Sequence, residues 1–276
     1  MNRTTQRWIV GGIAIVISFV VFLVPFVFIL LQAVKTAPDA GQLSFRWPQE
    51  WVFWDNLTTV LSTDDGLMGR AFWNSAVLTV GSVTIMVVLA AMVGYVLQRR
   101  PSRLNGVVSF FVLAGLIVPP AVVPTIWVLQ KTHLFKSMSG MILIEATFGL
   151  SFCILLFRAF VATIPRDLDE AAVLDGAGPI RLFFSVVLPL LRPVVVTVIV
   201  VQSVTVFNDF AGPLYFLPGS DNATVQQTLY SFQSRTLSQY NLLFTDILLT
   251  TIPPLVLYVF FNRQIVAGMT SGAVKG

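Results

Sequence analysis

The chain has 276 residues, of which 56% are hydrophobic and only 11% are charged, against about 25% charged residues in ordinary soluble domains. This composition excludes a typical soluble enzyme and indicates an integral membrane protein. One Cys and one His exclude an internal disulfide and a histidine-rich metal site.

Six largely apolar stretches follow one another along the chain, and each reaches the roughly 20 residues that a helix needs to cross a bilayer. We predict transmembrane helices at 8–33, 72–97, 105–129, 138–158, 185–207 and 240–262. The predicted fold is an all-α membrane protein with six transmembrane helices in a single domain over residues 1–276. The first apolar run exceeds the roughly 7 to 15 residues of a signal-peptide core, so we expect a retained anchor.

The distribution of basic residues predicts the orientation, because cytoplasmic loops carry the excess of Lys and Arg. Eleven of the 17 basic residues fall on the side of the termini: Arg3, Arg7, Arg99, Arg100, Arg103, Arg158, Arg166, Arg181, Arg192, Arg263 and Lys275. Six fall on the opposite side: Lys35, Arg46, Arg70, Lys131, Lys136 and Arg235. We therefore expect a multi-pass protein of the cell (cytoplasmic) membrane with both termini in the cytoplasm, extracytoplasmic loops at 34–70 and 209–239, and no nucleic-acid partner.

Aromatic residues gather in the first extracytoplasmic loop. Trp47, Trp51, Phe53 and Trp54 lie around Pro48. Two roles fit this cluster. It lies at the membrane interface as an aromatic belt, or it binds a partner outside the membrane.

The predicted cytoplasmic segment 163–189 has the features of a short helix followed by a turn. Pro165 suits a helix start, and Asp167, Asp169 and Glu170 favour the positive N-terminal end of a helix. We predict a helix over 166–177, which is marginal alone in water and so needs a packing partner. The alternative is an interfacial connector between two spans.

This segment carries a motif of a known family. Glu170, Ala171 and Ala172 are followed by Gly176 four residues later and by Leu188 and Pro189. In this pattern and spacing the chain resembles the membrane-spanning permease subunits of ATP-binding-cassette (ABC) importers, in their carbohydrate-uptake branch of maltose type. Residues 207–217 and 263–276 extend the resemblance, which covers about 71–276. Val186 and Phe207 depart from it, since isoleucine and tryptophan are usual there.

The resemblance implies a type I ABC importer permease architecture in which the segment 163–189 couples to a cytoplasmic ABC ATPase dimer. The coupling residues it implies are Asp169, Glu170, Ala171, Ala172, Leu174, Asp175, Gly176 and Ala177. It also implies a second permease subunit and an extracytoplasmic solute-binding protein as partners. ATP and Mg are expected on the ATPase and no cofactor on this chain, because no Lys follows a Gly as a phosphate-binding Walker loop requires.

A sugar pathway needs polar groups and aromatic rings within the membrane. The candidates are Glu145, Gln202, Ser203, Thr205, Phe207, Asn208 and Asp209. A carboxylate inside a span is expensive, which makes Glu145 a functional candidate, although interfacial water is within reach of it. Asn208 and Asp209 have a second possible role, which is to cap the helix end before Pro213.

The predicted function is therefore the membrane-spanning subunit of an ATP-driven, binding-protein-dependent sugar importer, and not an enzyme. The alternative is a self-sufficient, ion-coupled carrier or channel for a small solute. That class usually places several ionisable groups in the membrane or shows repeated halves. Glu145 is the one ionisable residue that the predicted spans place well inside the bilayer.

Overall fold

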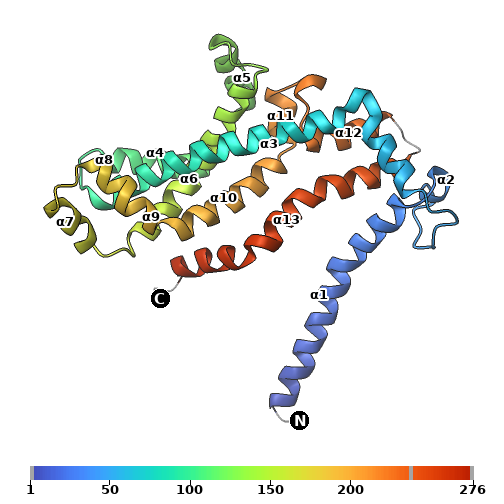
Figure 1. Ribbon diagram of the computed structural model, residues 1–276, viewed down its shortest axis with the longest axis horizontal. Helices are drawn as coiled ribbons and strands as arrows, with labels where there is room; N and C mark the ends of the chain where they lie inside the picture. The colour runs from blue at the N-terminus through green and yellow to red at the C-terminus, as the bar shows by residue number, and fades with distance from the viewer. Residues whose placement is uncertain (1–2, 236–238, 274–276) are drawn as a thin grey trace. The chain divides into compact units, whose positions relative to one another are not determined.

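The computed structural model describes residues 3–235 and 239–273, which contain helices and loops but no strand (Figure 1). The chain forms two compact units, Met1–Gly69 with Gln227–Ile252 and Arg70–Gln226 with Pro253–Gly276. Within the described residues four helices are long and apolar enough to cross a membrane, or up to six if each of two bent helix pairs is one span.

The first unit holds α1 (Arg3–Ala33) and α2 (Ala37–Ala40), and it shares α3 (Phe53–Arg99), α12 (Val225–Arg235) and α13 (Tyr240–Ala273) with the second unit. A buried polar network joins three of its helices. The Asn56 side-chain amide donates to the carbonyls of Ala33 and Lys35, each at 2.9 Å. The Asn241 amide donates to Asn56 Oδ1 at 2.6 Å. Since buried polar groups need partners, these bonds hold together the end of α1 and the starts of α3 and α13.

The three tryptophans of the loop 34–70 are exposed in the first unit. Trp47, Trp51 and Trp54 are 74%, 64% and 73% exposed. The rings of Trp47 and Trp51 lie 6.0 Å apart. Both roles considered for this cluster require exposed rings, so both stay predictions.

Helix α3 is two helices joined at a kink. Residues 63–66 leave helical geometry, and Asp64, Asp65 and Gly66 have φ of 50°, 53° and 76°. The helix after the kink, 67–99, contains the predicted span 72–97. Met86 and Ala90 on this helix are fully buried in the core of the second unit.

The second unit contains the remaining elements. These are α4 (Asn105–Ile117), α5 (Val122–Lys131), α6 (Met138–Val161), α7 (Asp167–Leu174), α8 (Pro179–Leu182), the π-helix η1 (Phe183–Val187), α9 (Leu188–Leu190), α10 (Arg192–Phe207), α11 (Ala211–Phe216) and the 3-10 turn η2 (Ser220–Asn222). Cys153, Phe157 and Val198 are fully buried in the core, where α6 packs against α4 and α10. Cys153 thus serves packing.

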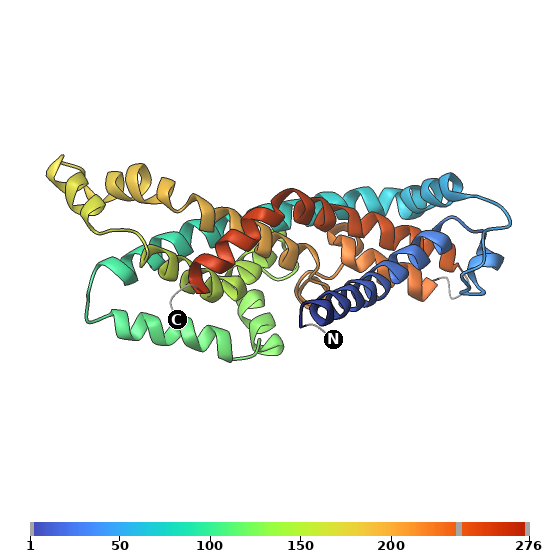
Figure 2. The same cartoon turned by 90° about the horizontal axis from the view of Figure 1, so that it is seen from below.

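Two of the predicted spans are bent. The predicted span 105–129 is α4 and α5 at an angle of 119°, a turn visible in Figure 2. Pro119 and Pro120 separate these helices, and Val118 before them is extended, as the residue before a proline tends to be. The predicted span 185–207 bends by 74° at Leu191. Pro189 and Pro193 flank that bend and lack the amide hydrogens that would continue a helix.

Candidate functional site

Helix α7 lies at one end of the second unit beside α8, as Figures 1 and 2 both show. Asp167, Asp169 and Glu170 occupy its first turn, where the helix dipole favours negative charge. The helix is shorter than the predicted 166–177, because it ends at Leu174 and the next three residues form a turn.

That turn is a Schellman motif, which explains the spacing of the sequence motif. The Gly176 amide donates to the Val173 carbonyl at 3.0 Å, and the Ala177 amide donates to the Ala172 carbonyl at 2.9 Å. Gly176 has φ of 79°, which glycine adopts freely. Ala172 and Ala177, the residues that contact each other in such motifs, both pack against the core. An alanine followed four residues later by glycine is therefore the spacing that this helix end requires.

The motif residues divide into an inward and an outward set. Ala172, Ala177 and Asp169 are partly buried. Glu170, Ala171, Asp175 and Gly176 are exposed, as is Leu174 at 88%. An exposed leucine beside an exposed carboxylate is a surface suited to another protein.

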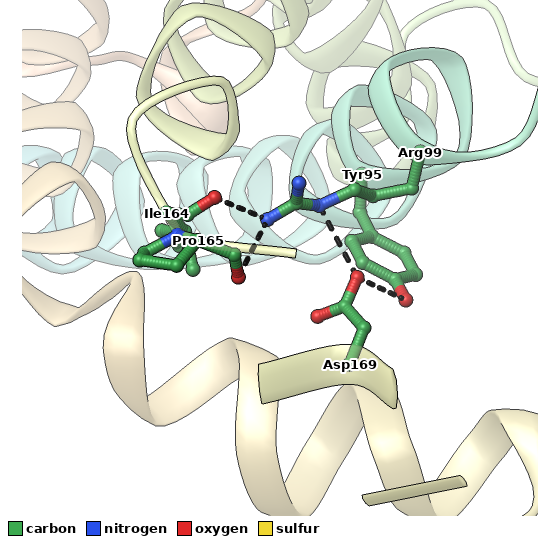
Figure 3. Close-up of polar contacts among 5 residues, drawn as sticks. All are labelled: Tyr95, Arg99, Ile164, Pro165 and Asp169. Atoms are coloured by element: carbon green, nitrogen blue, oxygen red, sulfur yellow. Dashed lines mark hydrogen bonds and ion pairs between the residues drawn. The ribbon is translucent and has the colours of Figure 1, made fainter. Parts of the chain in front are cut away.

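The structure also shows partners of Asp169 that the sequence did not indicate. Arg99 Nε lies 3.2 Å from Asp169 Oδ2, and the Tyr95 hydroxyl donates to the same oxygen at 3.4 Å (Figure 3). Arg99 also donates through its NH2 group to the Ile164 carbonyl at 2.6 Å and to the Pro165 carbonyl at 3.5 Å. The sequence offered one signal here, which is the group of basic residues in the run 97–103 at the end of an apolar span. These residues predict a cytoplasmic helix end, but they do not predict a contact with Asp169.

A second site is a cavity of about 590 Å³ near the end of α10. Four of the predicted pathway residues line it: Glu145, Thr205, Asn208 and Asp209. Phe148 and Tyr215 add aromatic rings. Glu145 is 7% exposed, and its Oε1 has no hydrogen-bond partner among the described residues. Because burying an unpaired carboxylate oxygen is unfavourable, this atom is suited to accept a hydrogen bond from a bound molecule.

The acids and amides at the end of α10 also organise the following loop. Asp209 accepts from the amides of Ala211 at 3.1 Å and Gly212 at 2.9 Å, and so caps the start of α11. Asn208 Oδ1 accepts from the Gln226 side chain at 3.1 Å. Asp209 thus caps the helix that follows α10 and not the end of α10 itself, and both residues also line the cavity.

The other three predicted pathway residues lie elsewhere. Ser203 lines a separate cavity of about 320 Å³ with residues of α3. The ring of Phe207 lies 6.5 Å from that of Phe72. Gln202 lies about one helical turn before Thr205 on α10. It is buried, and its Oε1 borders Gly149.

No group of three or more His, Cys, Asp or Glu side chains that could hold a metal occurs in the part of the chain that the structure describes. The side chains of 263–273 and the residues 274–276, which carry part of the family resemblance, lie outside the described structure.

Comparisons with known proteins agree on one family. Residues 86–271 match the family described as binding-protein-dependent transport system inner membrane component. The diacetylchitobiose uptake system permease of Streptomyces coelicolor is 30% identical over 93% of this chain and 85% of its own. The melibiose, raffinose and stachyose import permease of Bacillus subtilis is 26% identical over 99% of both chains. In fold, the chain matches a subunit of a bacterial ABC transporter involved in import of the acidic polysaccharide alginate, with a TM-score of 0.81, 19% identity and coverage of 95% and 98%.

Proposed function

Because this chain belongs to the family of binding-protein-dependent transport system inner membrane components, and is thus a permease subunit of an ABC importer, we propose that its solute is a carbohydrate. The relatives named for diacetylchitobiose and for melibiose, raffinose and stachyose support this substrate class, since all four are oligosaccharides. Family membership favours the importer over the self-sufficient carrier.

The observation that carries the coupling role is the exposed side of α7 before its Schellman turn. Glu170, Ala171 and Leu174 present one carboxylate and a small apolar surface. We propose that this surface enters a cleft on a cytoplasmic ABC ATPase dimer, which binds ATP and Mg. Closure of that dimer then moves α7 and shifts the transmembrane helices between inward-facing and outward-facing packings, together with a second permease subunit.

The orientation follows from the same assignment. If α7 meets a cytoplasmic ATPase, both termini are cytoplasmic, and the loops 34–70 and 209–239 are outside. The excess of basic residues on the α7 side supports this orientation. The outer loops then face an extracytoplasmic solute-binding protein, which delivers the sugar.

The cavity near the end of α10 has the chemistry that a sugar requires. Glu145 Oε1 is a buried acceptor without a hydrogen-bond partner in the described part of the chain, and Thr205 and Asn208 add a hydroxyl and an amide. Phe148 and Tyr215 provide rings on which the apolar face of a pyranose stacks. We propose that hydroxyl groups of the passing sugar donate to Glu145.

The test is purification of this chain from its native membrane in mild detergent, followed by identification of co-purifying proteins by mass spectrometry. We expect an ATPase with a Walker loop, a second permease and, on addition of ATP, a solute-binding protein. The complex is then reconstituted into liposomes and transport of radiolabelled oligosaccharides is measured. A chain that purifies alone and still transports solute with an ion gradient contradicts the proposal.

A further inference from the structure

The end of α3 contacts residues before, within and after α7. Tyr95 and Arg99 are four residues apart and so lie on the same face of α3. Arg99 bonds to the carbonyls of Ile164 and Pro165, which precede α7. Arg99 and Tyr95 together contact Asp169 within α7 (Figure 3). The ring of Tyr95 lies 5.7 Å from that of Phe183, which follows α7.

We propose that Arg99 and Asp169 are positioning residues that lock α7 to the cytoplasmic end of α3, so that a movement of α7 is transmitted to that long helix. This inference rests on the proposed function of α7. It assigns different roles to two neighbouring carboxylates, since Asp169 fixes α7 to its own chain while Glu170 meets the ATPase.

Burial and geometry support the locking role. The side chains of Arg99 and Asp169 are only 8% and 17% exposed, so solvent screens their attraction less than at an open surface. Glu170 is exposed, as an ATPase contact must be. Arg99 spans two sites because its guanidinium is broad and planar: its NH2 group donates to the Ile164 carbonyl, while its Nε lies beside the Asp169 carboxylate. Lysine, with a single nitrogen, does not reproduce this arrangement.

The Nε–H of Arg99 is not aimed at Asp169 Oδ2 as in a hydrogen bond, although the two atoms are 3.2 Å apart. Charge attraction therefore dominates this contact. Removing either charge should release α7 from α3 without changing the outward surface at Glu170, Ala171 and Leu174.

The experiment uses the complete transporter, reconstituted in liposomes with its ATPase, second permease and binding protein. The variants are Arg99→Gln, Asp169→Asn and both together, with Arg100→Gln and Asp167→Asn as matched controls at exposed neighbouring positions. Three quantities are measured: the ATPase retained on purification, ATP hydrolysis with and without loaded binding protein, and sugar transported per ATP.

We expect each single variant to retain the ATPase as wild type does but to lose about tenfold in sugar transported per ATP, a magnitude typical of residues that link moving elements. Stimulation of hydrolysis by the binding protein falls with it. The double variant should be no worse than either single variant, because both remove one interaction. Arg99→Lys keeps the charge but loses the two-site reach, so it should lose less than Arg99→Gln, and the controls should resemble wild type.

Several results overturn the inference. If the losses in the double variant multiply, the two residues act separately. If Asp169→Asn loses the ATPase as Glu170→Ala does, Asp169 is a docking residue. Unchanged transport per ATP in all variants shows that the lock transmits nothing.

Should Arg99→Gln fail to assemble, Tyr95→Phe removes only the hydroxyl and keeps the ring beside Phe183, and about a twofold loss in sugar transported per ATP is expected. Failure of the proposed function itself looks different, since the wild-type chain then carries no ATPase at all.

Discussion

The α7 segment and the cavity near the end of α10 use polar residues in opposite ways. In α7, Glu170 is exposed and the turn after it is held by backbone bonds. In the cavity, Glu145 is buried and one of its oxygens lacks a partner among the described residues. Side chains that face outward from a rigid helix end suit a protein partner, whereas buried polar atoms in a cavity suit a small polar molecule. The two regions should therefore respond differently to substitution.

The largest effect is expected at Glu170, because a substitution on the exposed side of α7 should weaken binding of the ATPase without unfolding the chain. On the proposed docking, Glu170→Ala removes a carboxylate that would meet a cation in a partly buried interface, and should weaken ATPase binding by about 1 to 3 kcal/mol. This corresponds to roughly 5- to 150-fold in the dissociation constant. The measurement is ATPase retention and titration on the purified permease pair. Asp167→Ala, in the same first turn, controls for the helix dipole, and equal losses in both variants would count against a specific contact.

Gly176 tests whether the outward surface depends on the Schellman turn. Its φ is 79°, and an added Cβ would meet no atom within 4 Å, so any penalty comes from the backbone alone. Gly176→Val should destabilise this turn by about 1 to 2 kcal/mol and reduce ATPase retention, because a β-branched residue is disfavoured at positive φ. Gly176→Asn should be milder, since asparagine tolerates this region.

The control for Gly176 is Gly178→Ala, because Gly178 has φ of −69° and also has free space for a Cβ. ATPase retention and thermal unfolding are compared for the three variants. If Gly178→Ala is as harmful as Gly176→Val, the loop tolerates no side chain and the conformation of Gly176 is not the cause.

The sequence predicted the α7 region well because its signals are local. The acids of the first turn, the alanine pair and Gly176 lie within ten residues, and together they specify a helix with a defined end. The family resemblance based on these residues is confirmed by the match over residues 86–271. The contact of Arg99 with Asp169 was not predicted, because the two residues lie far apart along the chain and only the packing of α3 against the α7 segment brings them together.

The cavity was predicted less well, because composition alone does not tell which side of a helix a residue occupies. Thr205 and Asn208 follow the i, i+3 spacing that places side chains on one face of a helix, Asp209 comes directly after the helix end, and all three line one cavity. Ser203 and Phe207 follow the i, i+4 spacing on another face. This spacing was readable in the sequence. The bends at Pro119 and at Leu191 were not predicted, since apolar length defines a span but not its straightness.

Substitution of Glu145 tests the cavity near the end of α10, where we expect a loss of solute binding and not of ATPase binding. Glu145→Gln keeps the shape and one acceptor oxygen but replaces the other with an amide donor, and should weaken a hydrogen bond from a sugar hydroxyl by about 1.5 kcal/mol. We expect sugar transport to fall about tenfold while ATPase retention stays at the wild-type level. Ser203→Ala is the matched control, because Ser203 lines a different cavity. A loss of the ATPase in Glu145→Gln would show that the carboxylate supports the fold instead.

Asp209 gives the smallest effect and separates its two roles. Asp209→Ala removes the acceptor for the amides of Ala211 and Gly212. Loss of such a helix cap should lower the free energy of unfolding by about 1 kcal/mol, which lowers the melting temperature by about 2 to 4 °C. Asp209→Asn keeps an acceptor oxygen and should recover most of that stability if capping is the main role. Asp221→Ala, at an exposed position in the same loop, should change neither quantity. If Asp209→Asn instead melts as wild type but transports as poorly as Glu145→Gln, the charge of Asp209 serves the solute, and the cavity then holds two acidic sugar contacts.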